Sequence, residues 1–247
     1  MKILLYTFSE DYNRELGIDL IPFGIESIEC NFEKQVFDIL KFNSDINILT
    51  TENYNINFLE EVRKLKQEMN FFLIIPNSFK PNELIKLTKF GIKSILNYND
   101  NTYQMAEEII KTILRYNLKT NERRMHMRVK INSYEKITAS VFLKDLRKFI
   151  RGLLIDISAG GFLLKLYDSL ESSLLVPNKP YDPVIITIGP FEIKTVSTLV
   201  YKKDDMAGFR FDNIEYKERR IIASYIHRKI QENIKELLSK SQISQTI

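Results

Sequence analysis

The first 118 residues alternate short apolar segments with amphipathic ones, and this alternation constrains the fold more than any other feature of the chain. The short segments have the composition of buried strands and lie at Ile3–Phe8, Ile25–Cys30, Ile46–Thr50, Phe71–Ile75 and Lys93–Leu96. Helical spacing of apolar residues is found over Asp11–Leu20, Phe32–Leu40, Phe58–Met69, Asn82–Phe90 and Met105–Leu118. Strands that alternate with helices predict a parallel sheet that is covered by helices on both faces.

This series of five β/α units resembles the response-regulator receiver, a doubly wound flavodoxin-like fold. The resemblance implies an acidic pair after the first strand, which holds Mg²⁺, and a phosphoryl-accepting aspartate after the third. It also implies a hydroxyl after the fourth strand and a lysine after the fifth. Instead, the chain has Tyr6–Phe8, Thr50, Pro76–Asn77 and Tyr98–Asn99 at these four positions. We therefore expect a pseudo-receiver that is not phosphorylated, and a plain α/β domain without receiver ancestry is the alternative.

The pattern changes after residue 118. Residues 119–128 lose helical periodicity, which indicates a linker. Short strand patterns separated by turn signals follow, at Ile137–Leu143, Phe149–Ile157, Phe162–Leu166, Val184–Ile188, Phe191–Tyr201 and Gly208–Phe211. Six such strands favour a closed or split antiparallel barrel. The predicted organisation is an α/β domain over residues 1–118, the linker over 119–128, and a β-barrel with a C-terminal helix over 129–247.

The C-terminal segment is predicted to be a long helix that begins near Tyr216. Its apolar stripe consists of Ile222, Ile226, Ile230, Ile234 and Leu237. Such a stripe normally packs on its own barrel, but a helix of this length can also pack on the pseudo-receiver or on a second subunit. His227 lies among basic residues of this helix, so we expect it to face solvent.

Two short motifs precede and follow the first strands of the predicted barrel. Arg124 and Arg128 form an RxxxR pair on the linker, and Arg123 comes directly before it. Asp156, Ser158 and Gly161 form a DxSxxG pattern at the point where a predicted strand runs into a turn. Glycines there would permit a positive φ and a close approach to the backbone.

RxxxR followed by DxSxxG resembles the PilZ domain, a small β-barrel that binds the second messenger cyclic di-GMP. The resemblance extends over about residues 121–212. It implies a ligand site made of Arg124, Arg128, Asp156, Ser158 and Gly161, to which we add the neighbouring Arg123 and Gly160. In this family the nucleotide is often bound as an intercalated dimer.

The residue types suit this ligand. An arginine binds guanine O6 and N7 with two hydrogen bonds, and it also pairs with phosphate. A carboxylate such as that of Asp156 can accept from guanine N1–H and N2–H₂, and the Ser158 hydroxyl suits a phosphate or a base edge. The alternative interpretation is a solvated basic linker, with Asp156 only capping its turn.

Composition narrows the class of protein further. The net charge of +4 does not by itself indicate nucleic-acid binding. A single cysteine, Cys30, excludes an intramolecular disulfide and fits a reducing compartment. No apolar run approaches the ~20 residues of a membrane span, and the N-terminus does not resemble a signal peptide. His126 has no Cys, His or carboxylate cluster near it in sequence, so we expect no metal site, and we expect a cytoplasmic protein.

The sequence predicts a non-enzymatic cyclic di-GMP effector without a cofactor, because P-loop, zinc-ligand and nucleophile-elbow patterns are missing. The ligand would order the arginine linker on the barrel and reorient the two domains toward an unidentified protein partner. Bacterial motility and biofilm formation are candidate outputs. The alternative is a nucleotide-independent adaptor, and a DNA-binding regulator ranks behind both.

Overall fold

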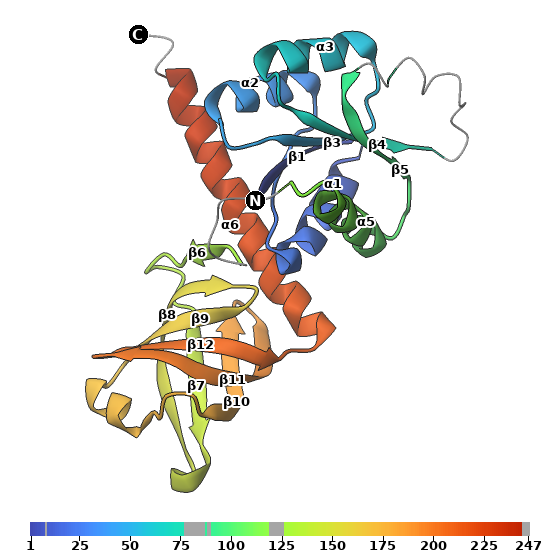
Figure 1. Cartoon of the computed structure of the whole chain (residues 1–247). Coiled ribbons are helices and arrows are strands. Elements are labelled where there is room, and N and C mark those ends of the chain that lie inside the picture. Colours follow the sequence, from blue (N-terminus) through green and yellow to red (C-terminus); the bar gives the residue numbers. More distant parts are fainter. Residues whose placement is uncertain (8, 77–86, 88–89, 119–125, 244–247) are drawn as a thin grey trace. The chain divides into compact units, whose positions relative to one another are not determined.

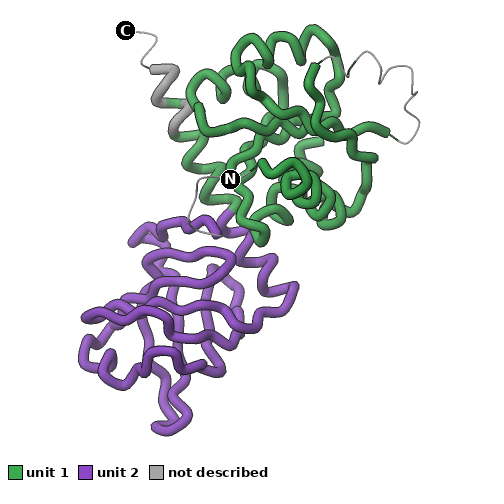
Figure 2. Tube along the Cα trace, viewed as in Figure 1, with its two compact units in different colours: residues 1–125, 227–247 green, residues 126–226 purple. Residues whose placement is uncertain are grey.

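We describe the protein from a computed structural model. It describes residues 1–243 apart from residues 8, 77–86, 88–89 and 119–125, and only the backbone at residues 237, 238 and 240–243. The chain forms two compact units, one of residues 1–125 and 227–247 and the other of residues 126–226 (Figure 2). The predicted helix Asn82–Phe90 lies largely outside the described residues.

The first unit contains a parallel five-stranded sheet with the order β2-β1-β3-β4-β5 (Figure 1). Its strands are β1 (Lys2–Tyr6), β2 (Glu26–Glu29), β3 (Ile48–Thr51), β4 (Asn70–Ile75) and β5 (Ile92–Asn97). This order is the one found in flavodoxin-like doubly wound folds, so the predicted receiver-like topology is confirmed.

Helices cover both faces of this sheet and form two separate apolar cores. Helices α1 (Glu10–Leu20) and α5 (Thr102–Arg115) pack on one face, and α2 (Glu33–Phe42) and α3 (Ile56–Leu65) pack on the other. A short 3₁₀ helix, η1 (Ile21–Phe23), follows α1. The inward side chains of the strands alternate between the two cores, as expected for a sheet that is buried on both faces.

The C-terminal helix α6 (Tyr216–Ile243) belongs to the first unit from His227 onward. Gln231 Nε2 donates a hydrogen bond to the Ser27 carbonyl of the edge strand β2, over 2.9 Å. Ile234 packs against the core on the α2 and α3 side. This segment of α6 therefore occupies the outer edge of β2, where backbone groups would otherwise lack a strand partner.

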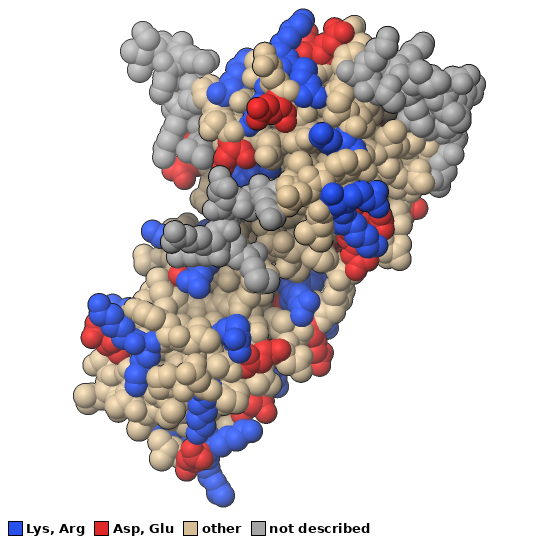
Figure 3. Space-filling model, in the orientation of Figure 1, with Lys and Arg blue, Asp and Glu red and all other residues tan. Residues whose placement is uncertain are grey.

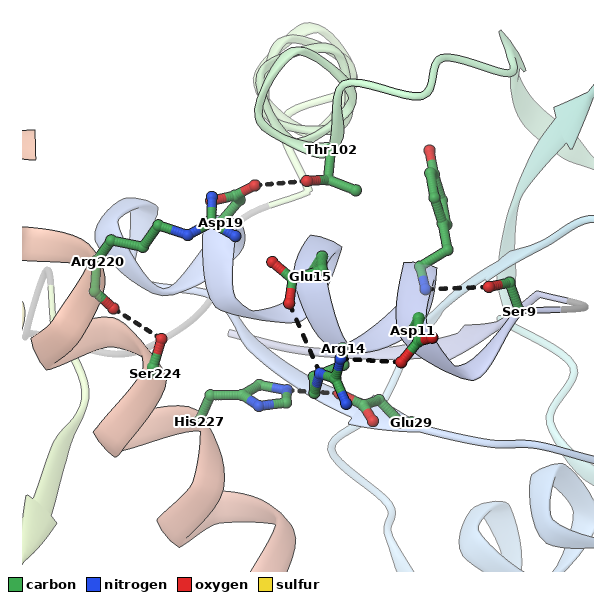
Figure 4. A network of polar contacts seen from close by, with 11 residues as sticks. Ser9, Asp11, Arg14, Glu15, Asp19, Glu29, Thr102, Arg220, Ser224 and His227 are labelled. Carbon is green, nitrogen blue, oxygen red and sulfur yellow. Dashed lines mark hydrogen bonds and ion pairs between the residues drawn. The ribbon is translucent and has the colours of Figure 1, made fainter. Parts of the chain in front are cut away.

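His227 is 4% exposed, so the expectation that it faces solvent is wrong. Its Nε2 lies 2.6 Å from Glu29 Oε1 at the end of β2 (Figure 4). Gly17 of α1 provides the room for the ring, because a Cβ at that position would lie 2.6 Å from His227 Nε2. The same figure shows Asp19 of α1 accepting a hydrogen bond from Thr102 Oγ1, which joins α1 to α5.

The second unit is a closed antiparallel barrel of six strands, as predicted. They are β7 (Thr138–Leu143), β8 (Lys148–Ser158), β9 (Gly161–Leu166), β10 (Pro180–Ile188), β11 (Phe191–Lys203) and β12 (Met206–Asn213). The ladder runs β8-β7-β10-β11-β12-β9, and pairing of β8 with β9 closes it. The short strand β6 (Arg128–Lys130), which the sequence analysis did not predict, adds to β8 from outside the ring. Two 3₁₀ helices, η3 (Lys144–Leu146) and η4 (Ser169–Leu174), lie between strands.

The first part of α6 belongs to the barrel unit. Glu218 accepts a hydrogen bond from the Lys194 backbone N–H of β11, and Tyr225 Oη donates to Glu135. Ile222 and Ile226 of the predicted apolar stripe are buried. Among the described residues, no helix is long and apolar enough to cross a membrane.

Gly17→Ala tests how closely α6 approaches α1. Glycine inside a helix costs about 1 kcal/mol relative to alanine, so this change would stabilise an unobstructed helix. Because the added Cβ would lie 2.6 Å from His227 Nε2 and from Ser27 Oγ, we expect a loss of about 1–3 kcal/mol instead. Thermal unfolding measures the sign. His227→Ala in the same background should recover part of the loss, and a higher Tm for Gly17→Ala alone would contradict the packing.

Candidate ligand-binding site

The predicted site residues that the structure describes lie at one end of β8. β6 pairs with this end, with Arg128 opposite Ser158 and Lys130 opposite Asp156. Arg128 Nη1 lies 3.9 Å from Asp156 Oδ1. The Arg128 side chain is 51% exposed, and an exposed ion pair of this length is worth at most about 1 kcal/mol. The guanidinium is therefore available to a ligand at little cost to stability.

A β-bulge in β8 decides which way Asp156 points. The register between β8 and β9 shifts between Leu154 and Asp156. Up to that point the buried side chains occupy even-numbered positions, Ile150 and Leu154 among them, and after it Ile157 is buried. Without the bulge, strict alternation would turn Asp156 toward the barrel interior. With it, the Asp156 side chain is 17% exposed and lies beside Arg128, with its Oδ1 buried.

Ser158 shapes the turn that follows. Its hydroxyl donates to the Gly161 carbonyl over 3.1 Å and accepts from the Gly160 backbone N–H over 3.3 Å. The residue is 4% exposed. Local side chain to backbone bonds of this kind stabilise turns. Ser158 thus holds the Gly160–Gly161 backbone in place in the structure.

The two glycines have different surroundings, and neither has a positive φ, so that expectation is wrong. A Cβ on Gly161 would collide with the Phe209 carbonyl oxygen of β12, which pairs beside it. A Cβ on Gly160 would meet the ring of His126. Gly161 therefore permits close strand packing, whereas Gly160 faces a side chain of the RxxxR motif.

His126 was considered in the sequence analysis only as a metal ligand. Its Nδ1 is buried and has no hydrogen-bond partner among the described residues. Burial, and then the positive charge of Arg219 on α6, lower the pKa of the imidazole below its ordinary value. Arg219 is distant in sequence, so no local pattern could have linked it to the site. Arg123 and Arg124 lie outside the described residues.

Among the described residues, the carboxyl end of the parallel sheet lacks the groups that phosphoryl transfer requires at the expected positions. Thr7 follows β1, and Thr50 lies fully buried in β3. The Tyr12 and Tyr98 rings stack there with centroids 5.1 Å apart, and Tyr12 Oη donates to the Asn99 carbonyl. Burial raises the Tyr12 pKa, which keeps the phenol neutral. In the described part of the chain, no group of three His, Cys, Asp or Glu residues could hold a metal ion.

Comparisons with known proteins give matches among solved structures only: no protein-family model and no curated protein matches the sequence. The PilZ domain of YcgR from Escherichia coli, solved with c-di-GMP, is 17% identical, with a TM-score of 0.40 over 48% of this chain and 99% of that chain. A response regulator receiver domain protein from Clostridium thermocellum is 18% identical, with a TM-score of 0.40 over 47% of this chain and 97% of that chain.

The inhibitor of motility MotI/DgrA from Bacillus subtilis is 20% identical, with a TM-score of 0.36 over 45% of this chain and 53% of that chain. All three structures are less than 25% identical to this chain. The c-di-GMP found in the YcgR structure is therefore a ligand of that protein.

Gly161→Ala and Gly160→Ala form a matched pair that tests the turn. We expect Gly161→Ala to destabilise the barrel by more than about 2 kcal/mol, because its Cβ meets backbone that two paired strands hold in place. Gly160→Ala should cost clearly less, since the His126 side chain can move aside. Unfolding monitored by circular dichroism compares the two. Equal losses would mean that the close approach to Phe209 is not what requires glycine.

The first unit should not accept a phosphoryl group. With Thr50 buried at the acceptor position and Tyr6–Thr7 in place of the acidic pair, acetyl phosphate and Mg²⁺ should leave the intact mass unchanged. A receiver that has all its carboxylates serves as the positive control. A phosphorylated residue mapped to residues 1–118 would contradict the assignment of the strand ends.

Proposed function

We propose that this protein is a non-enzymatic effector that binds cyclic di-GMP on the barrel at the end of β8. The observation that carries the proposal is the meeting of Arg128, Asp156 and the Gly160–Gly161 turn on adjoining strands. Residues from both sequence motifs thus lie within one small surface. An exposed guanidinium, a carboxylate beside it and a glycine-containing turn together suit guanine and phosphate.

Arg128 and Asp156 would contact different groups of the ligand. Arg128 can bind guanine O6 and N7 or a phosphate, and Asp156 can accept from guanine N1–H and N2–H₂. Ser158 acts by holding the turn, because its buried hydroxyl bonds to the Gly161 carbonyl and to the Gly160 backbone N–H. Arg123 and Arg124 contribute further guanidinium groups in this proposal, which makes an intercalated dimer of the nucleotide a suitable ligand.

Ligand binding is proposed to order residues 119–128 on the barrel and so to reorient the two domains toward a protein partner. In this proposal the two domains comprise residues 1–118 and 129–247. Bacterial motility and biofilm formation are the outputs that we propose for testing. The first unit serves as a docking surface rather than a phosphorylation switch in this scheme.

A nucleotide-independent adaptor is the second candidate, favoured by the weak Arg128–Asp156 pair that already joins the two motifs in the free protein. On the face that Figure 3 shows, basic and acidic side chains are interspersed, which does not favour a nucleic-acid-binding surface.

Isothermal titration with cyclic di-GMP tests the proposal. We expect a micromolar or tighter Kd for the wild type. Arg128→Ala and Asp156→Ala should each weaken binding by about 1–3 kcal/mol, the value of a good bidentate contact to a base. Arg128→Ala should change the free energy of unfolding by less than about 0.5 kcal/mol, because the side chain is exposed.

Arg151→Ala is the matched control. Arg151 is an exposed arginine on the same strand, paired with neither motif, and its loss should leave the Kd unchanged. If the wild type produces no heat at ~100 μM nucleotide, a concentration far above a micromolar Kd, the adaptor becomes the better interpretation. If folded Arg128→Ala binds like wild type, Arg128 has no part in the site.

A further inference from the structure

The ring of His126 covers the turn to which the proposed ligand would bind. A Cβ built on Gly160 would lie 3.2 Å from His126 Nε2 and 3.3 Å from Cγ, and still closer to Cδ2. The ring thus lies directly on the open side of the glycine Cα. Any group that approaches Gly160 from this side has to take the place of the ring.

The covered position suits a neutral imidazole. Its Nδ1 is buried and has no hydrogen-bond partner among the described residues, and burial disfavours the charged form of the ring. Arg219 on α6 opposes a positive charge on the ring. The carboxylates on the neighbouring strands are each next to an arginine already: Asp156 beside Arg128 on β8 and β6, and Asp212 beside Arg210 on β12.

We propose that the His126 ring covers the ligand site at Gly160, and that a guanine dinucleotide must displace the ring in order to bind. Protonation of the ring favours this displacement. This inference rests on the proposed function, because it concerns the same site. It adds a residue between the two motif arginines that controls access to the turn. It also makes the affinity for the ligand depend on pH.

The direction of this dependence follows from the two environments of the ring. On Gly160 the pKa of His126 is lowered, and a displaced ring regains the ordinary value of about 6.5 or a higher one beside a phosphate. Displacement is therefore accompanied by proton uptake at pH values between the two pKa values. Affinity should rise as the pH falls through about 6.5, by at most tenfold per pH unit.

Two substitutions separate the bulk of the ring from its charge. For the wild type, we expect the Kd for cyclic di-GMP at pH 5.5 to be about three- to tenfold lower than at pH 7.5. His126→Phe keeps a ring on Gly160 but cannot titrate, so its Kd should stay near the wild-type value at pH 7.5 and should not change with pH. His126→Ala removes the cover, so it should bind about two- to tenfold more tightly than wild type at pH 7.5.

Three results would overturn the cover: a wild-type affinity that does not change with pH, a pH dependence that persists in His126→Phe, or weaker binding by His126→Ala. If no variant binds cyclic di-GMP at either pH, the proposed function fails, and NMR then tests the cover alone. The chain has two histidines, so His126→Phe assigns both imidazole signals. A His126 pKa below 6.5 with a Gly160 amide shift that follows the titration supports the cover, and an ordinary pKa with an unmoved amide refutes it.

Discussion

The barrel and its candidate site both depend on the backbone pairing of strand β8. Its first half pairs with β7, and its second half pairs with β9 on one side and β6 on the other. The register shift between Leu154 and Asp156 separates these halves and reverses the inward and outward sides of the strand. This irregularity therefore presents Asp156 beside Arg128. The reversal follows because side chains alternate strictly along a regular strand, and one extra residue shifts that alternation.

The residues of the turn after β8 differ in how firmly the fold holds them. Ser158 and Gly161 are engaged by the fold: the hydroxyl bonds to turn backbone, and the glycine allows the Phe209 carbonyl to approach. Gly160 contacts only a movable side chain on that side. A ligand can replace a side chain, whereas it cannot replace a paired strand. Within the turn of the DxSxxG motif, a ligand could therefore approach Gly160 but not Ser158 or Gly161.

The first unit keeps the receiver-like topology while its carboxyl end is filled by aromatic and hydroxyl side chains. The Tyr12–Tyr98 stack and the buried Thr50 occupy the region where a phosphorylated receiver would need carboxylates. The unit also has a helix along the edge of its sheet: residues of α6 from His227 onward pack beside the edge strand β2. The contacts among His227, Glu29 and Gly17 join segments that are about two hundred residues apart in the chain. The first unit therefore includes residues of α6 from His227 onward.

The order of strands and helices, the parallel sheet with its flavodoxin-like topology, the six-stranded barrel and the lack of carboxylates at the receiver positions can all be read from the amino-acid sequence. These features follow from local periodicity and residue type, which short segments carry on their own. Four other features became evident only from the folded chain: the orientation of Asp156, the role of Gly161, the burial of His227 and the contact of His126 with Gly160. Each of these depends on the register of a strand or on a distant partner. Strand β6 was not predicted for the same reason. A segment of three residues shows no periodicity in sequence, and it forms a strand only by pairing with β8.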